Sequence, residues 1–327
     1  MRVLVAGGAG YIGSHTCKAL AQAGHTPIVY DNLHTGHAWA VKWGPFEQGD
    51  LNDRSALDGV MRRHRPDAVI NFAALAYVGE SMKEPTRYYR ANVAGMITFL
   101  EAMRAHDVGL IVFSSSCATY GTPDRLPIVE TMAQRPINPY GRSKLMAEEI
   151  LRDACAAHGL GAVALRYFNA AGADPEGELG EEHEPETHLI PLVLQAALDR
   201  RPVAIFGTDY ETPDGTCVRD YVHVNDLATA HVAALTASAA GRFAAYNLGS
   251  GHGASINEVI ACARAVTGKP IAAVAEARRQ GDPPVLVADA SLAGTALKWS
   301  PSHSDLGNVI GHAWKWMSEH RPRAMRG

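Results

Sequence analysis

A short apolar run near the start of the chain leads directly into a glycine-rich turn, and this feature constrains the fold more than any other. Val3 to Ala6 form the run, and Gly7, Gly10 and Gly13 follow it at three-residue spacing. The run predicts a buried strand, and residues Ile12 to Ala23 have the pattern of a helix. A helix that opens just after a strand presents free backbone N–H groups and its positive end to a phosphate. Because glycine lets the backbone approach such a ligand closely, the turn predicts a dinucleotide site.

Strand and helix patterns alternate along the rest of the first half. Further short strands are expected at Pro27–Asp31, Phe46–Gln48, Ala68–Asn71, Leu110–Ser114 and Val163–Tyr167. Helices are expected between them, from Asp53 to His64, from Pro85 to Met103 and from Tyr140 to about Cys155. This alternation predicts a parallel sheet that is covered by helices on both faces. Right-handed crossovers then make it a doubly wound α/β sheet of the Rossmann type.

The composition changes after Asn169. Residues 170–187 are rich in Gly, Pro, Glu and Asp, and they indicate a long loop of the kind that binds ligands in compact enzymes. A helix at Leu192–Asp199 and a strand at Val203–Phe206 follow. We therefore expect a Rossmann domain over residues 1–169 and a smaller, mixed α/β, substrate-binding domain over residues 170–327. Segments near residues 222–250 are expected to return to the first domain.

An acidic residue ends the second expected strand. Asp31 lies close to the separation from the glycine turn at which a carboxylate accepts hydrogen bonds from the ribose of a bound adenosine. The residues after it, 32–37, include no Lys or Arg that would receive a 2′-phosphate. The sequence therefore favours NAD over NADP as the cofactor. Asp50, which follows Gln48 and Gly49, is expected near the adenine amino group.

Three serines and a Tyr–Lys pair indicate where chemistry takes place. Ser114 to Ser116 follow the strand expected at Leu110–Ser114, and doubly wound sheets bind ligands outside the carboxyl ends of their strands. Tyr140 and Lys144 are four residues apart in an expected helix, so their side chains share one face. Such a pair alone is most often a surface pair. Together with the glycine turn and the serines, it indicates a catalytic group.

These side chains suit the removal of a hydride from a carbon that carries a hydroxyl group. The hydroxyl proton must leave as well, and a phenol, whose pKa is ordinarily about 10, needs a lower pKa to accept it at neutral pH. A nearby ammonium and the positive nicotinamide ring both favour the phenolate, so we expect a lowered pKa for Tyr140. Lys144 is also suited to hold the nicotinamide ribose, and Ser116 to hydrogen-bond the reacting oxygen.

The glycine turn and the Tyr-x-x-x-Lys pair resemble those of the extended short-chain dehydrogenase/reductases. Within that family the chain resembles the UDP-glucose 4-epimerases along nearly its whole length. The matching strings include residues 7–15, 78–81, 139–144, 166–169, 205–210, 214–221 and 278–282. The strings after residue 200 are more specific than the glycine turn because they lie in the expected substrate domain. The resemblance implies a homodimeric isomerase with tightly bound NAD that inverts C4 of a UDP-linked sugar.

The resemblance also implies which residues hold each ligand. The residues implied at NAD are Gly7, Gly10, Tyr11, Ile12, Gly13, Asp31, Asn32, Asp50, Leu51, Phe72, Ala73, Asn92, Ser114, Tyr140, Lys144 and Phe168. The residues implied at the UDP-sugar are Ser116, Tyr140, Asn169, His188, Leu189, Ala204, Ile205, Phe206, Arg219, Arg279, Asp282 and Leu286. The two arginines suit a diphosphate on chemical grounds as well, because a guanidinium donates paired hydrogen bonds to phosphate oxygens.

Three positions depart from the pattern of the family. Ala76 stands where some members have a Lys near the nicotinamide, His188 where Asn is frequent, and Cys117 where many members have Ala. The missing lysine removes one cofactor contact, and the histidine puts one hydrogen bond to the uridine diphosphate in doubt.

Other activities stay open as alternatives. Related dehydratases and decarboxylases usually place an acid beside the catalytic Ser or Thr, and Ser116 has no such neighbour. A 4-epimerase for UDP-xylose and UDP-arabinose is a closer alternative, and so is one that accepts UDP-N-acetylglucosamine past Leu286. A non-catalytic NAD-binding regulator is a further alternative, but it would not need the Ser, Tyr and Lys together.

Composition excludes several other classes of protein. The net charge of −4 provides no basic excess for nucleic acid or an anionic membrane. No apolar stretch approaches the length of a membrane span, and the run before Gly7 is too short for a signal peptide. The five cysteines are odd in number, widely spaced and lack C-x-x-C, as expected for reduced thiols in a cytoplasmic protein. The fifteen histidines form no H-E-x-x-H or similar run, so no metal is expected.

Overall fold

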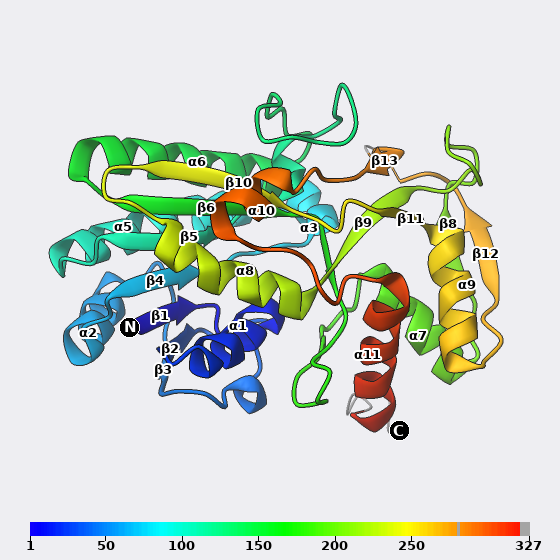
Figure 1. Ribbon diagram of the computed structural model, residues 1–327, viewed down its shortest axis with the longest axis horizontal. Helices are drawn as coiled ribbons and strands as arrows, with labels where there is room; N and C mark the ends of the chain where they lie inside the picture. Colours follow the sequence, from blue (N-terminus) through cyan, green and yellow to red (C-terminus); the bar gives the residue numbers. More distant parts are fainter. Residues whose placement is uncertain (280–281, 321–327) are drawn as a thin grey trace.

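A seven-stranded parallel sheet forms the larger of two lobes in the computed structural model, which describes residues 1–279 and 282–320 (Figure 1). In spatial order its strands are β10 (Phe243–Leu248), β6 (Gly161–Tyr167), β5 (Leu110–Ser114), β4 (Ala68–Asn71), β1 (Arg2–Ala6), β2 (Thr26–Asp31) and β3 (Phe46–Gln48). The strands after β1 run outward in one direction to β3 and then in the other direction from β4, so the order reverses between β1 and β4. The doubly wound sheet expected from the sequence is confirmed.

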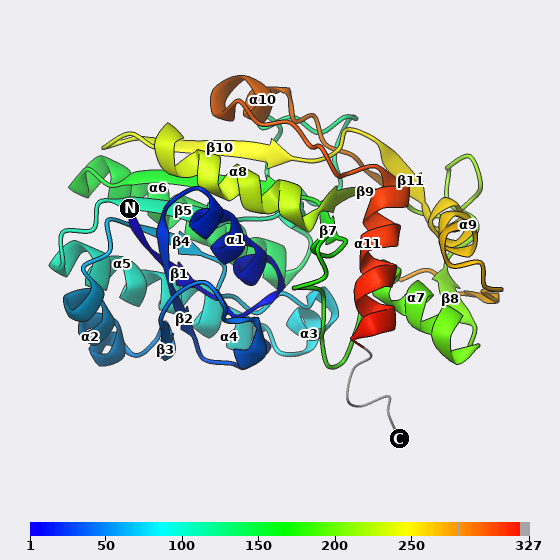
Figure 2. The same cartoon turned by 60° about the horizontal axis from the view of Figure 1, so that its bottom comes forward.

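Helices cover both faces of this sheet (Figure 2). On one face lie α2 (Arg54–His64), α5 (Gly95–Ala105) and α6 (Pro139–His158). On the other face lie α1 (Tyr11–Gln22), α8 (Val224–Ala237) and α10 (Ser291–Leu297). Successive residues of β1 point to opposite faces, so Leu4 packs under the first set and Val5 under the second. Across the described residues, no helix combines the length and the apolar character that crossing a membrane requires.

The helix expected from Pro85 to Met103 is divided in the structure. After a short helix α3 (Val78–Lys83), α4 (Pro85–Tyr88) passes into a π-helical segment (Tyr89–Ala94), and α5 continues the helix to Ala105. The π-helical segment carries Asn92, whose side chain hydrogen-bonds the Leu75 backbone in both directions, at 2.8 and 3.0 Å. π-helical turns are frequent at functional sites, and this one places Asn92 against the loop that follows β4.

The smaller lobe has a mixed α/β core. Its main sheet contains β7 (Asn169–Ala171), β9 (Val218–His223), β11 (Gly253–Ser255) and β13 (Val285–Leu286), and β8 (Val203–Phe206) pairs with β12 (Ala273–Glu276). Its core, which includes Ile190, Ile260 and Ile310, is enclosed by α7 (Leu189–Asp199), α9 (Ile256–Thr267) and α11 (Leu306–Glu319). A capping box between Ser255 and Glu258 fixes where α9 begins.

The chain passes between the lobes more than once. α8 and β10 belong to the larger lobe although both follow residue 170 in the sequence. β7 takes the first two residues of the loop expected at 170–187, because Asn169–Ala171 pair with Tyr221–His223 of β9. Gln280 and Gly281, part of the matching string at 278–282, lie outside the described residues, as do residues 321–327 of the expected second domain.

Candidate active site

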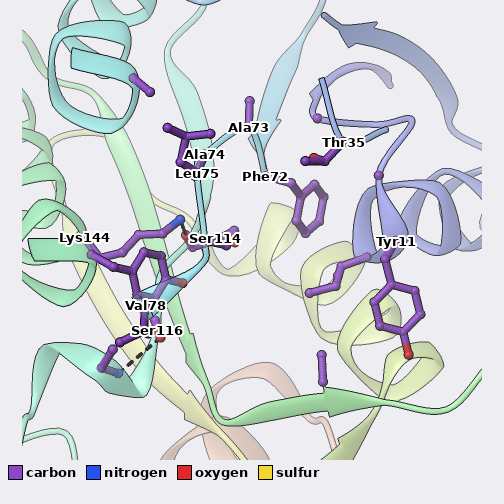
Figure 3. Close-up of a pocket in the computed structure, with 18 of the residues that line it drawn as sticks. Tyr11, Thr35, Phe72, Ala73, Ala74, Leu75, Val78, Ser114, Ser116 and Lys144 are labelled. Carbon is purple, nitrogen blue, oxygen red and sulfur yellow. Dashed lines mark hydrogen bonds between the residues drawn. The ribbon is translucent and has the colours of Figure 1, made fainter. Parts of the chain in front are cut away.

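A cavity of about 470 Å³ opens where the strands of the larger lobe end (Figure 3). Residues that follow β1, β2, β4, β5 and β6 line it, and this is the edge at which doubly wound sheets bind ligands. The lining includes these residues expected at NAD: Gly7, Gly10, Tyr11, Ile12, Gly13, Asp31, Asn32, Asp50, Leu51, Phe72, Ala73, Ser114, Tyr140, Lys144 and Phe168. Asn92 lies behind the lining, where it bonds Leu75 and donates a hydrogen bond of 2.9 Å to Ser143.

The glycine turn needs glycine at two positions for reasons of space. Gly7 has a φ of +76°, and a Cβ on it would lie 2.6 Å from the backbone nitrogen of Ala73. A Cβ on Gly13 would lie 2.1 Å from the carbonyl oxygen of Gly7. The N-cap of α1, Gly10, offers no side chain to the N–H groups of the first turn. Because the first turn of α1 lines the cavity, these donors and the positive end of the helix suit a pyrophosphate there.

Asp31 is buried at the end of β2, where the backbone holds its carboxylate. It accepts hydrogen bonds from the N–H of Ala9, at 3.0 Å, and from that of Leu33, at 2.8 Å. Burial raises the pKa of this carboxyl, and the two backbone donors offset part of the rise. Asn32 next to it donates a hydrogen bond of 2.8 Å to Asp50. A fixed acid at this strand end suits the ribose hydroxyls of adenosine and disfavours a 2′-phosphate.

The side chains of the expected catalytic group meet in the same cavity, and Figure 3 shows Ser116 and Lys144 on one side of it. Ser116 follows β5, and Tyr140 and Lys144 lie in the first two turns of α6. α6 starts there because Asn138 accepts a backbone N–H at 2.8 Å as N-cap and a proline occupies the first position. Lys144 Nζ donates to the Ser114 carbonyl at 2.8 Å and lies 5.8 Å from the centre of the Tyr140 ring.

The pKa of Tyr140 corrects the expectation from the sequence. Burial raises it to about 12, and the Ser116 side chain offsets only part of the rise. Burial also lowers the pKa of Lys144 to about 7, although Glu148 acts in the opposite direction, so this amine is only partly charged at neutral pH. The expected lowering by a lysine ammonium is therefore wrong for the side chains of the chain by themselves. A bound nicotinamide ring would add the positive charge that favours the phenolate.

A buried ion pair lies behind the expected catalytic side chains. Glu148, one turn after Lys144 on α6, accepts hydrogen bonds from Arg166 of β6 at 2.9 and 2.6 Å and from Ser115 at 2.6 Å. The exposed fraction is 0% for the glutamate side chain and 2% for that of the arginine. Arg166 also donates to the Tyr120 hydroxyl at 2.8 Å. The pair ties α6 to β6 and to the serines after β5, and so supports the geometry of the site.

The residues expected at the UDP-sugar fall into two groups. Ser116, Tyr140, Asn169, His188, Asp282 and Leu286 line the cavity. Leu189, Ala204, Ile205, Phe206, Arg219 and Arg279 lie outside its lining. Arg219 forms an ion pair with Asp282, which connects it to the cavity wall. Arg279 stacks on Phe206, with the guanidinium carbon 4.0 Å from the ring centre.

Several lining side chains were not expected from the sequence. They include Asn138, Tyr167, Glu181 and His183. Tyr167 and Ser114 share a hydrogen bond of 2.5 Å between their hydroxyls. For Glu181 and His183 the sequence did contain a signal, the pattern Glu-x-His-x-x-Glu-x-His at 181–188. The composition of this segment, however, predicts only a loop.

Comparison with known proteins places the chain in a class. The model of the NAD dependent epimerase/dehydratase family matches residues 3–249. The chain therefore belongs to this family of NAD-dependent enzymes. A relative within it, the UDP-glucose 4-epimerase of Rhizobium meliloti, is 51% identical over 97% of this chain and 97% of its own length. The resemblance to the UDP-glucose 4-epimerases that the sequence strings indicate is thus confirmed.

Solved structures agree with this placement. The UDP-glucose 4-epimerase from Brucella ovis, in complex with NAD, has a TM-score of 0.92 and 53% identity, over 96% of this chain and 97% of that one. The enzyme from Stenotrophomonas maltophila, with bound NAD and formylated UDP-arabinopyranose, has a TM-score of 0.93 and 42% identity, over 98% of both chains. The likeness thus covers both lobes, including the one expected to hold the substrate.

Proposed function

We propose that the protein is an isomerase that interconverts UDP-glucose and UDP-galactose by inverting C4 with tightly bound NAD. The observation that carries the proposal is the meeting of Ser116, Tyr140 and Lys144 in one cavity with Asp31 and the uncapped start of α1. Ser116, Tyr140 and Lys144 suit the oxidation of a carbon that carries a hydroxyl group. Asp31 and the start of α1 suit a dinucleotide that has no 2′-phosphate. The names of the relatives support the choice of a UDP-linked sugar.

Each catalytic residue has a separate task in this proposal. NAD, when bound, supplies the acceptor and later the donor of the hydride at C4. Tyr140 takes the proton of the C4 hydroxyl as the carbon is oxidised, and returns it when the carbon is reduced. Ser116 hydrogen-bonds the same oxygen and orients it. Lys144 holds the cofactor ribose and places a partly charged amine near the phenol.

We expect NAD to copurify with the protein and not to be consumed. Epimerisation returns the hydride to the opposite face of the same 4-keto sugar, so the cofactor stays bound between the two half-reactions. The measurement is conversion of UDP-galactose to UDP-glucose by chromatography, with NADH absorbance followed in parallel. Release of free NADH in proportion to turnover would contradict the proposal and indicate a dehydrogenase. Bound NAD with no turnover of any UDP-sugar would favour the non-catalytic regulator.

Leu286 offers a test of which sugars the cavity accepts. It lies on β13 and lines the cavity, and the resemblance implies that a large Tyr at this position narrows the sugar pocket in some epimerases. We propose that leucine leaves room for an N-acetyl group at C2, so that UDP-N-acetylglucosamine is at least a slow substrate. Leu286→Tyr should lower kcat/KM for the N-acetylated sugar by roughly ten- to hundredfold and largely spare UDP-galactose. Equal losses on both sugars, or no N-acetylated activity in the unmutated protein, would exclude Leu286 as the gate.

A UDP-pentose is the second candidate substrate. The similar structure from Stenotrophomonas maltophila contains a modified UDP-arabinopyranose, so a pentose-linked nucleotide is compatible with this fold. Assays with UDP-xylose and UDP-galactose in parallel distinguish a preference for the pentose from a preference for the hexose, because the preferred sugar has the higher kcat/KM.

We also propose that the protein is a cytoplasmic homodimer with no nucleic-acid partner. The helical face formed by the π-helical segment, α5 and α6 exposes Ile97 at 44% and Met146 at 37%, and a hollow between them is also lined by Tyr89 and Val93. Exposed apolar faces of this kind are typical of protein contacts. The five cysteines are free thiols, which suits a reducing compartment. Light scattering that finds the mass of a single 35.0 kDa chain would contradict the dimer.

A further inference from the structure

Four side chains converge in the loop between β7 and α7, and none of them is a catalytic residue of the proposed reaction. Glu181, His183, Glu186 and His188 each offer one nitrogen or oxygen atom, and these atoms all lie within 4.8 Å of one another. His188 Nδ1 lies 2.8 Å from Glu181 Oε1 and 3.0 Å from Glu186 Oε1. His183 Nδ1 lies 3.3 Å from Glu181 Oε1 and 3.6 Å from Glu186 Oε2. We call these four residues the loop cluster.

The two carboxylates of the loop cluster are buried, and among the described residues no lysine or arginine pairs with them. Only 6% of each glutamate side chain is exposed, and within the described residues their ion pairs involve only His183 and His188.

A neighbouring group of acids provides the contrast. Asp174, Glu176 and Glu178 also converge, but the ammonium of Lys18 occupies their centre at 2.5 to 2.9 Å. A side chain of the protein itself therefore already fills the centre of that group. The loop cluster has no lysine or arginine in this place among the residues that the structure describes.

Among the described residues, two buried polar atoms at the loop cluster have no hydrogen-bond partner of good geometry. Nδ1 of His183 is one, although two carboxylates are close to it, and the hydroxyl of Tyr77 is the other. The ring of Tyr77 stands at 83° to that of His183, with 6.2 Å between the ring centres. Buried polar groups are rarely left unpaired. Nδ1 of His183 lies 3.3 and 3.6 Å from the two carboxylates, at a position from which all three groups can contact one ion.

We propose that Glu181, His183, Glu186 and His188 bind a divalent transition-metal ion such as Zn²⁺. Imidazole nitrogens and carboxylate oxygens are its usual ligands, with bonds of about 2.0 to 2.2 Å in a tetrahedron. Ligand atoms in such a tetrahedron lie roughly 3.3 Å apart, from the same bond lengths. The His183 distances of 3.3 and 3.6 Å already match this separation. His188, whose side chain is 47% exposed, needs to move outward by only a few tenths of an ångström.

The position of the loop cluster indicates what such an ion would do. Glu181, His183 and His188 line the cavity. The same loop is bonded to the cofactor side, because Tyr11 Oη donates to the Gly172 carbonyl at 2.6 Å and His37 lies 2.9 Å from the Glu182 carbonyl oxygen. An ion at the cluster would link residues 181 and 188 of this loop and so fix the part of the loop that lines the cavity. It would also fix the orientation of the His188 ring, which lines the cavity.

The experiment measures Zn²⁺ directly, on the full-length protein with its copurified NAD and without any sugar nucleotide. After treatment with a chelator, the protein is dialysed against Zn²⁺, and metal is counted by mass spectrometry of the elements. We expect about one ion per chain. His183→Ala and the nearly isosteric Glu186→Gln should each weaken binding at least about tenfold. Glu176→Gln, in the group that Lys18 fills, is the matched control and should bind like the unmutated protein.

Cobalt provides a second readout that a purely structural defect would not imitate. Co²⁺ in the cluster should show the intense visible absorption of a tetrahedral site, and Zn²⁺ should displace it in the unmutated protein. Circular dichroism of the metal-free variants shows whether they fold. If His183→Ala does not fold, Glu186→Gln still tests the proposal. Binding that is absent, substoichiometric or equal in all variants would overturn the proposal. Because no sugar is turned over, this result is independent of the proposed epimerase activity.

Discussion

Tyr140→Phe is expected to lower kcat for the interconversion of UDP-galactose and UDP-glucose by a factor of roughly 100 to 10,000. Phenylalanine keeps the ring but removes the only atom of this side chain that can take the C4 hydroxyl proton. The fold and the bound NAD should be retained, because phenylalanine fills the same space and Lys144 keeps its hydrogen bond to the Ser114 carbonyl. The measurement is turnover under saturating substrate, with circular dichroism and the extracted NAD content as checks.

Lys144→Met is the informative companion to this variant. It removes both the amine near the phenol and the proposed contact to the cofactor ribose, so turnover and NAD content should fall together. Tyr140→Phe should lower turnover alone. If Tyr140→Phe kept a near-normal rate, the proton would have to go to another base, and the assignment of Tyr140 would be wrong.

The large sheet could be predicted from the sequence because its signals are local. Val3 to Ala6 form a continuous apolar run, and the structure buries all of it in β1. The division of the helix between Pro85 and Ala105 could not be predicted in this way. α-helical and π-helical turns have similar compositions, and the turn that carries Asn92 is positioned by bonds to Leu75 and Ser143, which are remote in sequence.

In the site, too, local sequence patterns predict some features, whereas others depend on contacts between residues that are remote in sequence. That Gly7, Asp31 and Ser116 share one cavity could be predicted, because the ends of parallel strands meet at one edge of a sheet. The pKa of Tyr140 could not, because it depends on how deeply the folded chain buries the phenol. Nor could the sequence show that Arg219 pairs with Asp282, since its pattern carries no information about which charges meet.

Glu148 marks the place where the largest loss of stability is expected. Glu148→Ala leaves the guanidinium of Arg166 buried without its partner, which should lower the free energy of unfolding by roughly 3 to 5 kcal/mol. The methyl group can replace neither the two hydrogen bonds from Arg166 nor the one from Ser115. Urea denaturation followed by circular dichroism measures the change.

Two further variants decide whether the lost pairing is the cause of this destabilisation. Glu149→Ala removes the adjacent, exposed carboxylate of the same helix and should change the free energy of unfolding by at most about 0.5 kcal/mol. Glu148→Leu combined with Arg166→Met removes both charges and refills the volume with apolar atoms, which often restores stability because no charge is left buried alone. The double variant should therefore be more stable than Glu148→Ala. If Glu148→Ala instead unfolded like Glu149→Ala, water or another side chain would have to satisfy the buried arginine, and the ion pair would not support α6 as described.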